Sequence, residues 1–284
     1  MPLLTIARLT LREAARRRLL LAVSLLTLLV IGLTGWGFSR LATLQDNGHP
    51  APHAEILGVT SGIVILVAYM FSFVLAIGSA FLAAPAIASD VESGLALSLL
   101  PRPMPRSDFV LGKWLGLAVL LTVYTSVAGG LELAMIDVVT GYLPPHPILA
   151  IAFLIGQSLV LLTLALLAST RLSAITGGII AVALFGVAWI AGIVTAVGAA
   201  FNNTTLATYG TVVSLIVPTD GLWRSALFNL EPAAMVAASN LDRATRATPF
   251  VVAAPSPTPY LVWAAAWVVV MLGLAVRSFT RRDV

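Results

Sequence analysis

The chain has 284 residues, of which 59% are hydrophobic and only 10% are charged, and its mean hydropathy is +1.01. Soluble domains carry roughly 25% charged residues, so this composition excludes an ordinary soluble domain and indicates a protein that crosses a membrane several times. The absence of cysteine excludes disulfide bonds, thiolate metal sites and thiol catalysis. The formal net charge of +4 does not indicate nucleic-acid binding, because the basic residues are distributed as they are around membrane spans.

The first predicted element is an amphipathic helix over residues 2–18, with arginines on one face and apolar side chains on another. The two faces are formed by Arg8, Arg12 and Arg16 and by Leu4, Leu11 and Ala15. Such a helix is expected to lie in the membrane interface, with its arginines toward anionic headgroups. A cleavable signal peptide is a poor alternative, because the following apolar run is about 20 residues long and no A-x-A site ends it.

Six apolar stretches long enough to cross a bilayer follow. They cover residues 19–38, 56–84, 114–136, 148–170, 172–200 and 259–276. Pro85 is expected to end the second span, and the residues around Arg171 are expected to form a tight hairpin between the fourth and fifth spans. The predicted fold class is therefore an all-α polytopic membrane protein with a single transmembrane domain, residues 1–284.

The 16 lysines and arginines lie mostly on one side of these spans. Those assigned to the opposite side are Arg40, Arg224, Arg243 and Arg246. The positive-inside rule then places both termini and the connection between the second and third spans, residues 89–113, in the cytoplasm.

Residues 201–258 form an extracytoplasmic segment in this topology. Its apolar run 212–217 is too short to span a membrane, so we expect short helices that lie on the outer leaflet or dip into it. The stretch PTDGLWRSALFNL (218–230) begins with the helix N-cap candidates Thr219 and Asp220, and the stretch that begins at Pro232 is a second candidate helix.

Several catalytic and nucleotide-binding motifs are missing from the chain. The single Gly-Lys pair, Gly112-Lys113, has no preceding glycine-rich loop, and neither a G-x-S-x-G nor an H-E-x-x-H motif is present. We therefore expect no catalytic residue and no cofactor in this chain, so that a partner would have to supply any nucleotide site. The three histidines, His49, His53 and His146, are interpreted as polar loop residues and not as metal ligands.

Glu132 is an ionisable residue within the third span. A carboxylate in a span is a candidate functional group, because its unpaired burial is costly. The alternative is a structural role, in which Glu132 reaches outer water or pairs with a neighbouring span.

The charged stretch ESGLALSLLPRPMPRSDFVLGKW (Glu92–Trp114) separates two very apolar ones. Its pattern predicts a short apolar helix, a proline-rich elbow and a second helix, capped by Ser107 or Asp108, that continues into the third span. A helix anchored in this way is suited to transmit force from a docked partner. The pattern is equally compatible with a solvated loop that carries positive-inside charges.

This stretch resembles the corresponding loop of the ABC-2 type permeases, the membrane subunits of ATP-binding-cassette transporters. The family pattern is Glu-x-Gly, a short Leu-rich helix, Pro-x-x-Arg and a Leu-rich stretch that ends in Gly-Lys. The matching positions are Glu92 and Gly94, then Leu97, Leu99 and Leu100, then Pro103 and Arg106, then Leu111, Gly112, Lys113 and Gly116. One departure is Leu95, which stands where a threonine commonly follows the glycine. Residues 217–230 resemble an outer segment of the branch that includes the permease of nitrous-oxide-reductase maturation.

The resemblance implies a subunit that pairs with a second copy, or with a sibling permease, in a prokaryotic inner membrane. Cytoplasmic ATPase subunits, which bind ATP and magnesium, would dock on residues 89–113 and on the N-terminal helix. Glu92 and Arg106 would orient the coupling helix, the side chains of Leu97–Leu100 would fill a groove on the ATPase, and Lys113 belongs to the same coupling motif.

These features leave three hypotheses for the function. The first is export of an amphiphile, a drug or a similar molecule. The second is a mechanical coupler, in which residues 201–258 remodel or deliver to an extracytoplasmic partner and no small molecule is conducted. The third, a proton-driven transporter that uses Glu132, is disfavoured because such machines usually need several ionisable or broken-helix sites in the membrane.

Overall fold

The computed structural model describes residues 2–16, 18–41, 45–46, 49–50, 53–93, 105–232, 250, 252 and 254–281. Nearly all of these residues are helical, and β1 (Gln45–Asp46) forms a short antiparallel pair with β2 (His49–Pro50). The helices are α1 (Pro2–Arg16), α2 (Arg18–Leu41), α3 (His53–Ala83), α4 (Pro85–Glu92), α6 (Arg106–Thr140), α7 (Pro147–Ser169), α8 (Ala174–Ala200), α9 (Thr204–Ile216), α10 (Asp220–Leu230) and α13 (Thr258–Thr280).

Five helical stretches of the described residues are long and apolar enough to cross a membrane. They are Ile56–Glu92, Arg106–Thr140, Pro147–Ser169, Ala174–Ala200 and Thr258–Thr280. The first predicted span lies in α2, whose apolar part Ser24–Arg40 is shorter than the other five. The predicted fold class, an all-α polytopic membrane protein, is confirmed.

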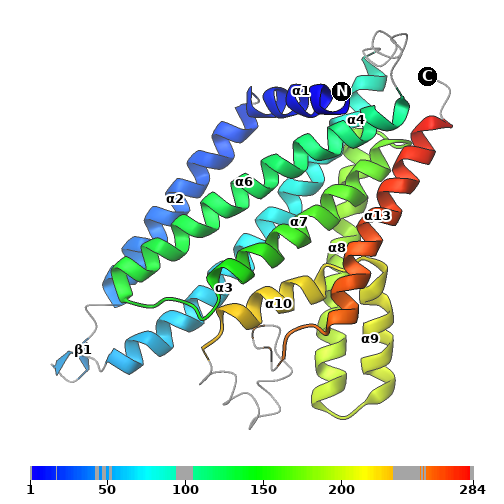
Figure 1. The fold of residues 1–284 in the computed structure, drawn as a ribbon. Helices are drawn as coiled ribbons and strands as arrows, with labels where there is room; N and C mark the ends of the chain where they lie inside the picture. The colour runs from blue at the N-terminus through cyan, green and yellow to red at the C-terminus, as the bar shows by residue number, and fades with distance from the viewer. Residues whose placement is uncertain are drawn as a thin grey trace.

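The long helices alternate in direction, so that both termini lie at one end of the bundle (Figure 1). We call this end the termini end, and the other the far end. At the termini end α1 lies across the bundle, α4 ends and α6 begins. The predicted tight turn near Arg171 is also present there, between Ser169 and Ala174.

The prediction that Pro85 ends the second span is wrong. α3 ends at Ala83, Ala84 keeps helical angles, and α4 begins with Pro85 in its first turn. Proline is tolerated in a first turn, because the N–H that it lacks has no partner within the helix there. The span therefore continues to Glu92 after a one-residue break.

α6 begins earlier than predicted. Its first residue is Arg106 and its N-cap position is Pro105, so the predicted caps Ser107 and Asp108 lie within its first turn. The helix ends at Thr140, and Gly141 follows with a φ of 70°, a left-handed conformation that glycine adopts without steric cost.

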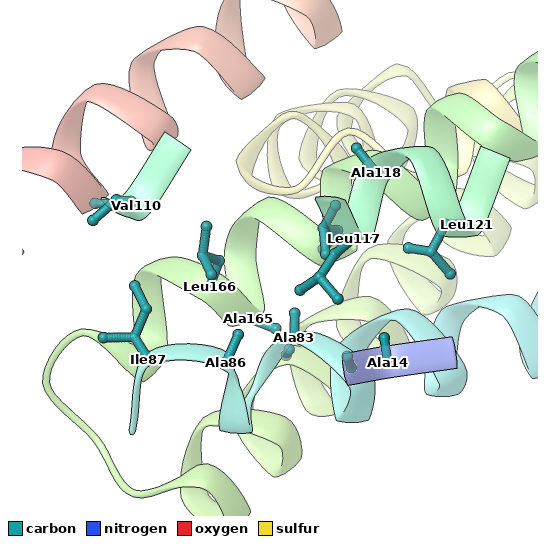
Figure 2. Packing of buried hydrophobic residues seen from close by; sticks show 14 of the residues in the cluster. Ala14, Ala83, Ala86, Ile87, Val110, Leu117, Ala118, Leu121, Ala165 and Leu166 are labelled. Atoms are coloured by element: carbon teal, nitrogen blue, oxygen red, sulfur yellow. The ribbon is translucent and has the colours of Figure 1, made fainter. Parts of the chain in front are cut away.

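α7 lies among the other long helices and holds them with both apolar and polar contacts. Figure 2 shows Ile87 of α4, Val110 and Leu117 of α6 and Leu166 of α7 converging near the termini end. Ser72 of α3 and Gln157 of α7 exchange hydrogen bonds of 3.0 and 2.9 Å. Polar contacts of this kind hold helices together in a bilayer. Apolar side chains alone do so weakly, because lipid tails are as apolar as a neighbouring helix.

The expected short helices between the last two spans are α9 and α10. α9 runs back alongside α8, and its last carbonyls, those of Leu215 and Ile216, accept hydrogen bonds of 3.1 and 2.8 Å from Trp263 and Trp267 of α13. Trp267 lies nine residues into α13, which is roughly 13 Å at 1.5 Å per residue. The segment therefore dips back between the spans. The second candidate helix, which begins after Pro232, lies outside the described residues.

Candidate functional site

Lys113, the single lysine of the chain, forms ion pairs with two other helices. Its Nζ lies 2.7 Å from Asp90 Oδ2 of α4 and 3.7 Å from Glu13 Oε2 of α1. Lys113 and Asp90 are each only 7% exposed. Burial of such charges is tolerated because opposite charges meet. We call Glu13, Asp90 and Lys113 the Lys113 cluster.

α1 also approaches the backbone of α6 at two glycines. A Cβ at Gly116 would lie 2.9 Å from Thr10 Cβ and 2.6 Å from the carbonyl oxygen of Ala7, and one at Gly112 would lie 2.7 Å from Ile6 Cβ. A side chain at either position would separate the two helices. The buried face of α1 contains Ile6, Ala7, Thr10 and Ala14, whereas Leu4 and Arg8 of the predicted faces are exposed.

The start of α6 contacts α13 as well. The Phe109 and Phe279 rings stack with centroids 5.4 Å apart and an interplanar angle of 19°. Arg106 Nη1 donates to the carbonyl oxygen of Thr280 over 3.2 Å. Arg171, in the turn between α7 and α8, donates through Nε to Ser278 Oγ over 3.0 Å. The first turns of α6 therefore touch α1, α4 and α13 together.

The predicted ATPase-coupling residues occupy three different settings. Glu92 is exposed at the end of α4, Arg106 is half-buried at the start of α6, and Lys113 is buried. The remaining predicted coupling residues, Gly94, Leu97, Leu99, Leu100 and Pro103, lie outside the described residues. Sequence reasoning missed Glu13, although it is the one acidic residue in α1.

Glu132 is half-buried in α6 and faces α2. Its carboxyl group interacts with the Thr34 hydroxyl of α2. About two turns nearer the termini end, Thr27 and Tyr124 share a 2.7 Å hydrogen bond between the same two helices. Glu132 thus faces a neighbouring span, but its Oε1 is buried and has no hydrogen-bond partner among the described residues, so both its structural and its functional role stay predictions.

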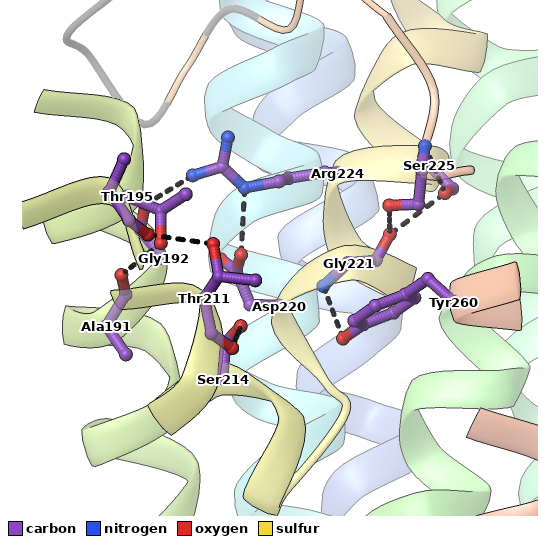
Figure 3. Close-up of polar contacts among 12 residues, drawn as sticks. Ala191, Gly192, Thr195, Thr211, Ser214, Asp220, Gly221, Arg224, Ser225 and Tyr260 are labelled. Atoms are coloured by element: carbon purple, nitrogen blue, oxygen red, sulfur yellow. Dashed lines mark hydrogen bonds and ion pairs between the residues drawn. The ribbon is translucent and has the colours of Figure 1, made fainter. Parts of the chain in front are cut away.

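At the far end, the start of α10 is joined to α8 and α13 (Figure 3). Arg224 Nε lies 2.8 Å from Asp220 Oδ2, and Nη2 donates to the carbonyl oxygen of Gly192 over 2.5 Å. The Asp220 carboxylate occupies the space that a Cβ at Gly192 would need. The backbone N–H of Gly221, which has no acceptor within the helix, donates to Tyr260 Oη over 3.0 Å.

The end of α10 is fixed to the loop between α6 and α7 and to the residues before α13. Tyr142 Oη donates to the carbonyl oxygen of Leu230 over 2.8 Å, and the backbone N–H of Val252 donates to Glu231 Oε1 over 3.0 Å. Glu231 is 2% exposed, and this burial raises the pKa of its carboxyl to about 8. Burial, with a smaller contribution from the Glu231 charge, raises the pKa of Tyr142 to about 12.

A small cavity lies between α3, α8 and α10, and its walls include the aromatic rings of Tyr69, Phe73, Phe185, Trp189 and Trp223. Its volume of about 10 Å³ is about the minimum that holds one water molecule. Among the described residues, no three His, Asp or Glu side chains gather closely enough to hold a metal ion, and His146 is exposed.

Comparison with known proteins assigns the family. A family model described as an ABC-2 family transporter protein matches residues 4–284. The chain is 31% identical over 127 residues to the probable ABC transporter permease protein NosY of Pseudomonas aeruginosa (strain PAO1), and this match covers 44% of the chain and 42% of that relative. Since the family model spans nearly all of the sequence, the chain belongs to the ABC-2 family of transporter proteins.

Proposed function

We propose that this chain is the permease subunit of an ABC exporter whose ATPase is a separate polypeptide. The ATPase docks at the cytoplasmic surface on residues 89–113 and on α1. ATP binding and hydrolysis in the partner move these elements, and the spans then switch the membrane pathway between inward and outward access.

The contact of α6 with α1, α4 and α13 at the termini end is the observation that carries this proposal. α4 ends at the exposed Glu92 and α6 begins at Arg106, so both helix ends that flank the connection lie at the termini end. Lys113, Gly116 and Phe109 then tie α6 to the three other elements. A partner that moves this connection therefore acts on several helices at once.

The pathway itself is proposed to form between two permease subunits. The cavity between α3, α8 and α10 is far smaller than the roughly 300–1,000 Å³ of sites for drug-sized ligands. A pathway that admits an amphiphile therefore needs either a second subunit or a rearrangement of these helices. We propose a dimer, either of two copies or with a sibling permease.

Copurification with candidate ATPases from the same source tests the proposal. The wild-type chain is compared with a Glu92→Ala/Arg106→Ala variant, and with Asp137→Ala as a matched control at the far end, where Asp137 is exposed. We expect a stoichiometric ATPase to bind the wild type and the control, and the double variant to lose most of the bound ATPase or its stimulation. Failure of every candidate to bind the wild type contradicts the proposal.

Transport by the reconstituted complex separates export from mechanical coupling. Export predicts ATP-dependent movement of an amphiphilic dye across proteoliposomes. A complex that hydrolyses ATP normally but moves no amphiphile, and instead acts on an extracytoplasmic protein, supports the mechanical coupler.

A further inference from the structure

Lys113 is too deeply buried to be a docking contact. At 7% exposure, with its Nζ against Asp90 and over the Phe109 ring at 5.7 Å from the centroid, it offers almost no surface to another protein. Yet it lies in the segment whose sequence resembles a coupling motif. A residue so placed acts through its neighbours within the chain.

The two carboxylates around Lys113 differ in their distance from its Nζ and in their exposure. Asp90 is buried and forms the shorter contact of 2.7 Å, whereas the side chain of Glu13 is 50% exposed and lies 3.7 Å away. When a buried lysine has a single carboxylate partner, separating the two is costly, because it leaves an uncompensated charge. A second carboxylate lowers that cost, since Lys113 stays paired when α4 moves relative to α6.

We infer that Lys113, Asp90 and Glu13 are positioning residues, which carry movement of the connection between α4 and α6 into α1. This inference rests on the proposed function. Asp90 lies two residues before the exposed Glu92 in the single short helix α4, so a displacement at Glu92 is passed directly to Asp90. As the distance from Lys113 Nζ to Asp90 increases, the distance from Nζ to Glu13 decreases. α1 then follows α6, against which it already packs at Gly112 and Gly116.

The absence of cysteine makes this movement measurable. Cysteines introduced at the exposed positions Leu9 in α1 and Leu172 in the turn after α7 carry spin labels. The distance between the labels is measured in the complex with the ATPase, without nucleotide and with ATP, magnesium and vanadate. The variants are Glu13→Gln and Asp90→Asn/Lys113→Met, and the control is Asp137→Asn, which removes an exposed charge at the far end.

We expect a nucleotide-dependent change of distance in the wild type and the control. The change should fall at least twofold in Glu13→Gln and further in the double variant, while the ATPase bound per permease stays constant. A full change in Glu13→Gln overturns the inference even where the double variant fails to fold, because Glu13 is half-exposed and its replacement leaves the Lys113–Asp90 pair intact. A wild type that binds no ATPase overturns the proposed function, and the inference with it, whereas bound ATPase with equal changes in all variants overturns the inference alone.

Discussion

At the termini end, side chains of opposite charge from three helices meet at Lys113, whereas at the far end several polar side chains bond to backbone groups. Lys113 contacts two carboxylates. Tyr260 accepts from the N–H of Gly221, Tyr142 donates to the carbonyl of Leu230, and Trp267 donates to the carbonyl of Ile216.

The difference concerns how easily each contact can be exchanged. An ion pair with two candidate acceptors can shift from one to the other and remain satisfied. A bond to the free N–H or C=O at a helix end has no such alternative, because its loss leaves a backbone group unpaired. Lys113 can therefore exchange one carboxylate for the other, whereas the bonds to the ends of α9 and α10 hold these helices in place.

The largest expected effect comes from removal of the cation at either end. Lys113→Met leaves Asp90 buried and unpaired, and Arg224→Met does the same to Asp220, so each should lower the free energy of unfolding by about 3–5 kcal/mol. Arg224→Met should be the more damaging, because Arg224 also donates to Gly192. Thermal unfolding of the purified chain in detergent measures both losses.

Double variants that replace both charged residues of a pair by neutral ones test whether the loss of stability comes from the unpaired charge. Asp90→Asn/Lys113→Met and Asp220→Asn/Arg224→Met remove both charges of each pair, so each double variant should recover part of the stability lost by its single variant. No recovery at the termini end would mean that Lys113 acts mainly by packing and not as a charge.

A smaller effect is expected at the contact of α1 with α6. Gly116→Ala places a methyl group against Thr10 and the carbonyl of Ala7, and overpacking of this kind costs about 1–3 kcal/mol. Gly130→Ala in the same helix is the control, because nothing lies within 4 Å of its Cβ position, and it should be neutral or stabilising by up to about 1 kcal/mol. Equal stability of the two variants, in the same unfolding assay, would contradict the close contact.

Sequence patterns predicted the long helices well, because hydrophobic length and charge placement are local properties. The apolar runs and the turn near Arg171 are examples. The prediction that Pro85 ends the second span was wrong, because a proline breaks the interior of a helix but is tolerated in its first turn. The sequence alone did not show that α4 begins at Pro85.

The site was only partly predictable. Lys113 was singled out by its motif, but its burial depends on contacts with α1 and α4, which are distant in sequence. Glu13 was missed because a single acidic residue among arginines looks like an ordinary surface charge. The contact of α1 at Gly112 and Gly116 was likewise invisible, since glycine pairs indicate close approach without naming the partner helix.

The last expected effect is a pH dependence, and it concerns Glu231 at the far end. Its folded-state pKa of about 8 lies above the ordinary value of 4.5, so the protonated form is the one that the fold favours. The stability that it contributes is therefore fully present below about pH 4.5 and is lost as the pH rises through 8. Glu231→Gln, which cannot ionise, should match the wild type near pH 4, and its melting temperature should exceed that of the wild type increasingly as the pH rises from 6 to 9. Asp137→Asn removes an exposed carboxylate and should leave the pH dependence unchanged. A wild type whose melting temperature rises between pH 6 and 9, relative to Glu231→Gln, would show that Glu231 is ionised in the fold and that the contact with Val252 outweighs its burial.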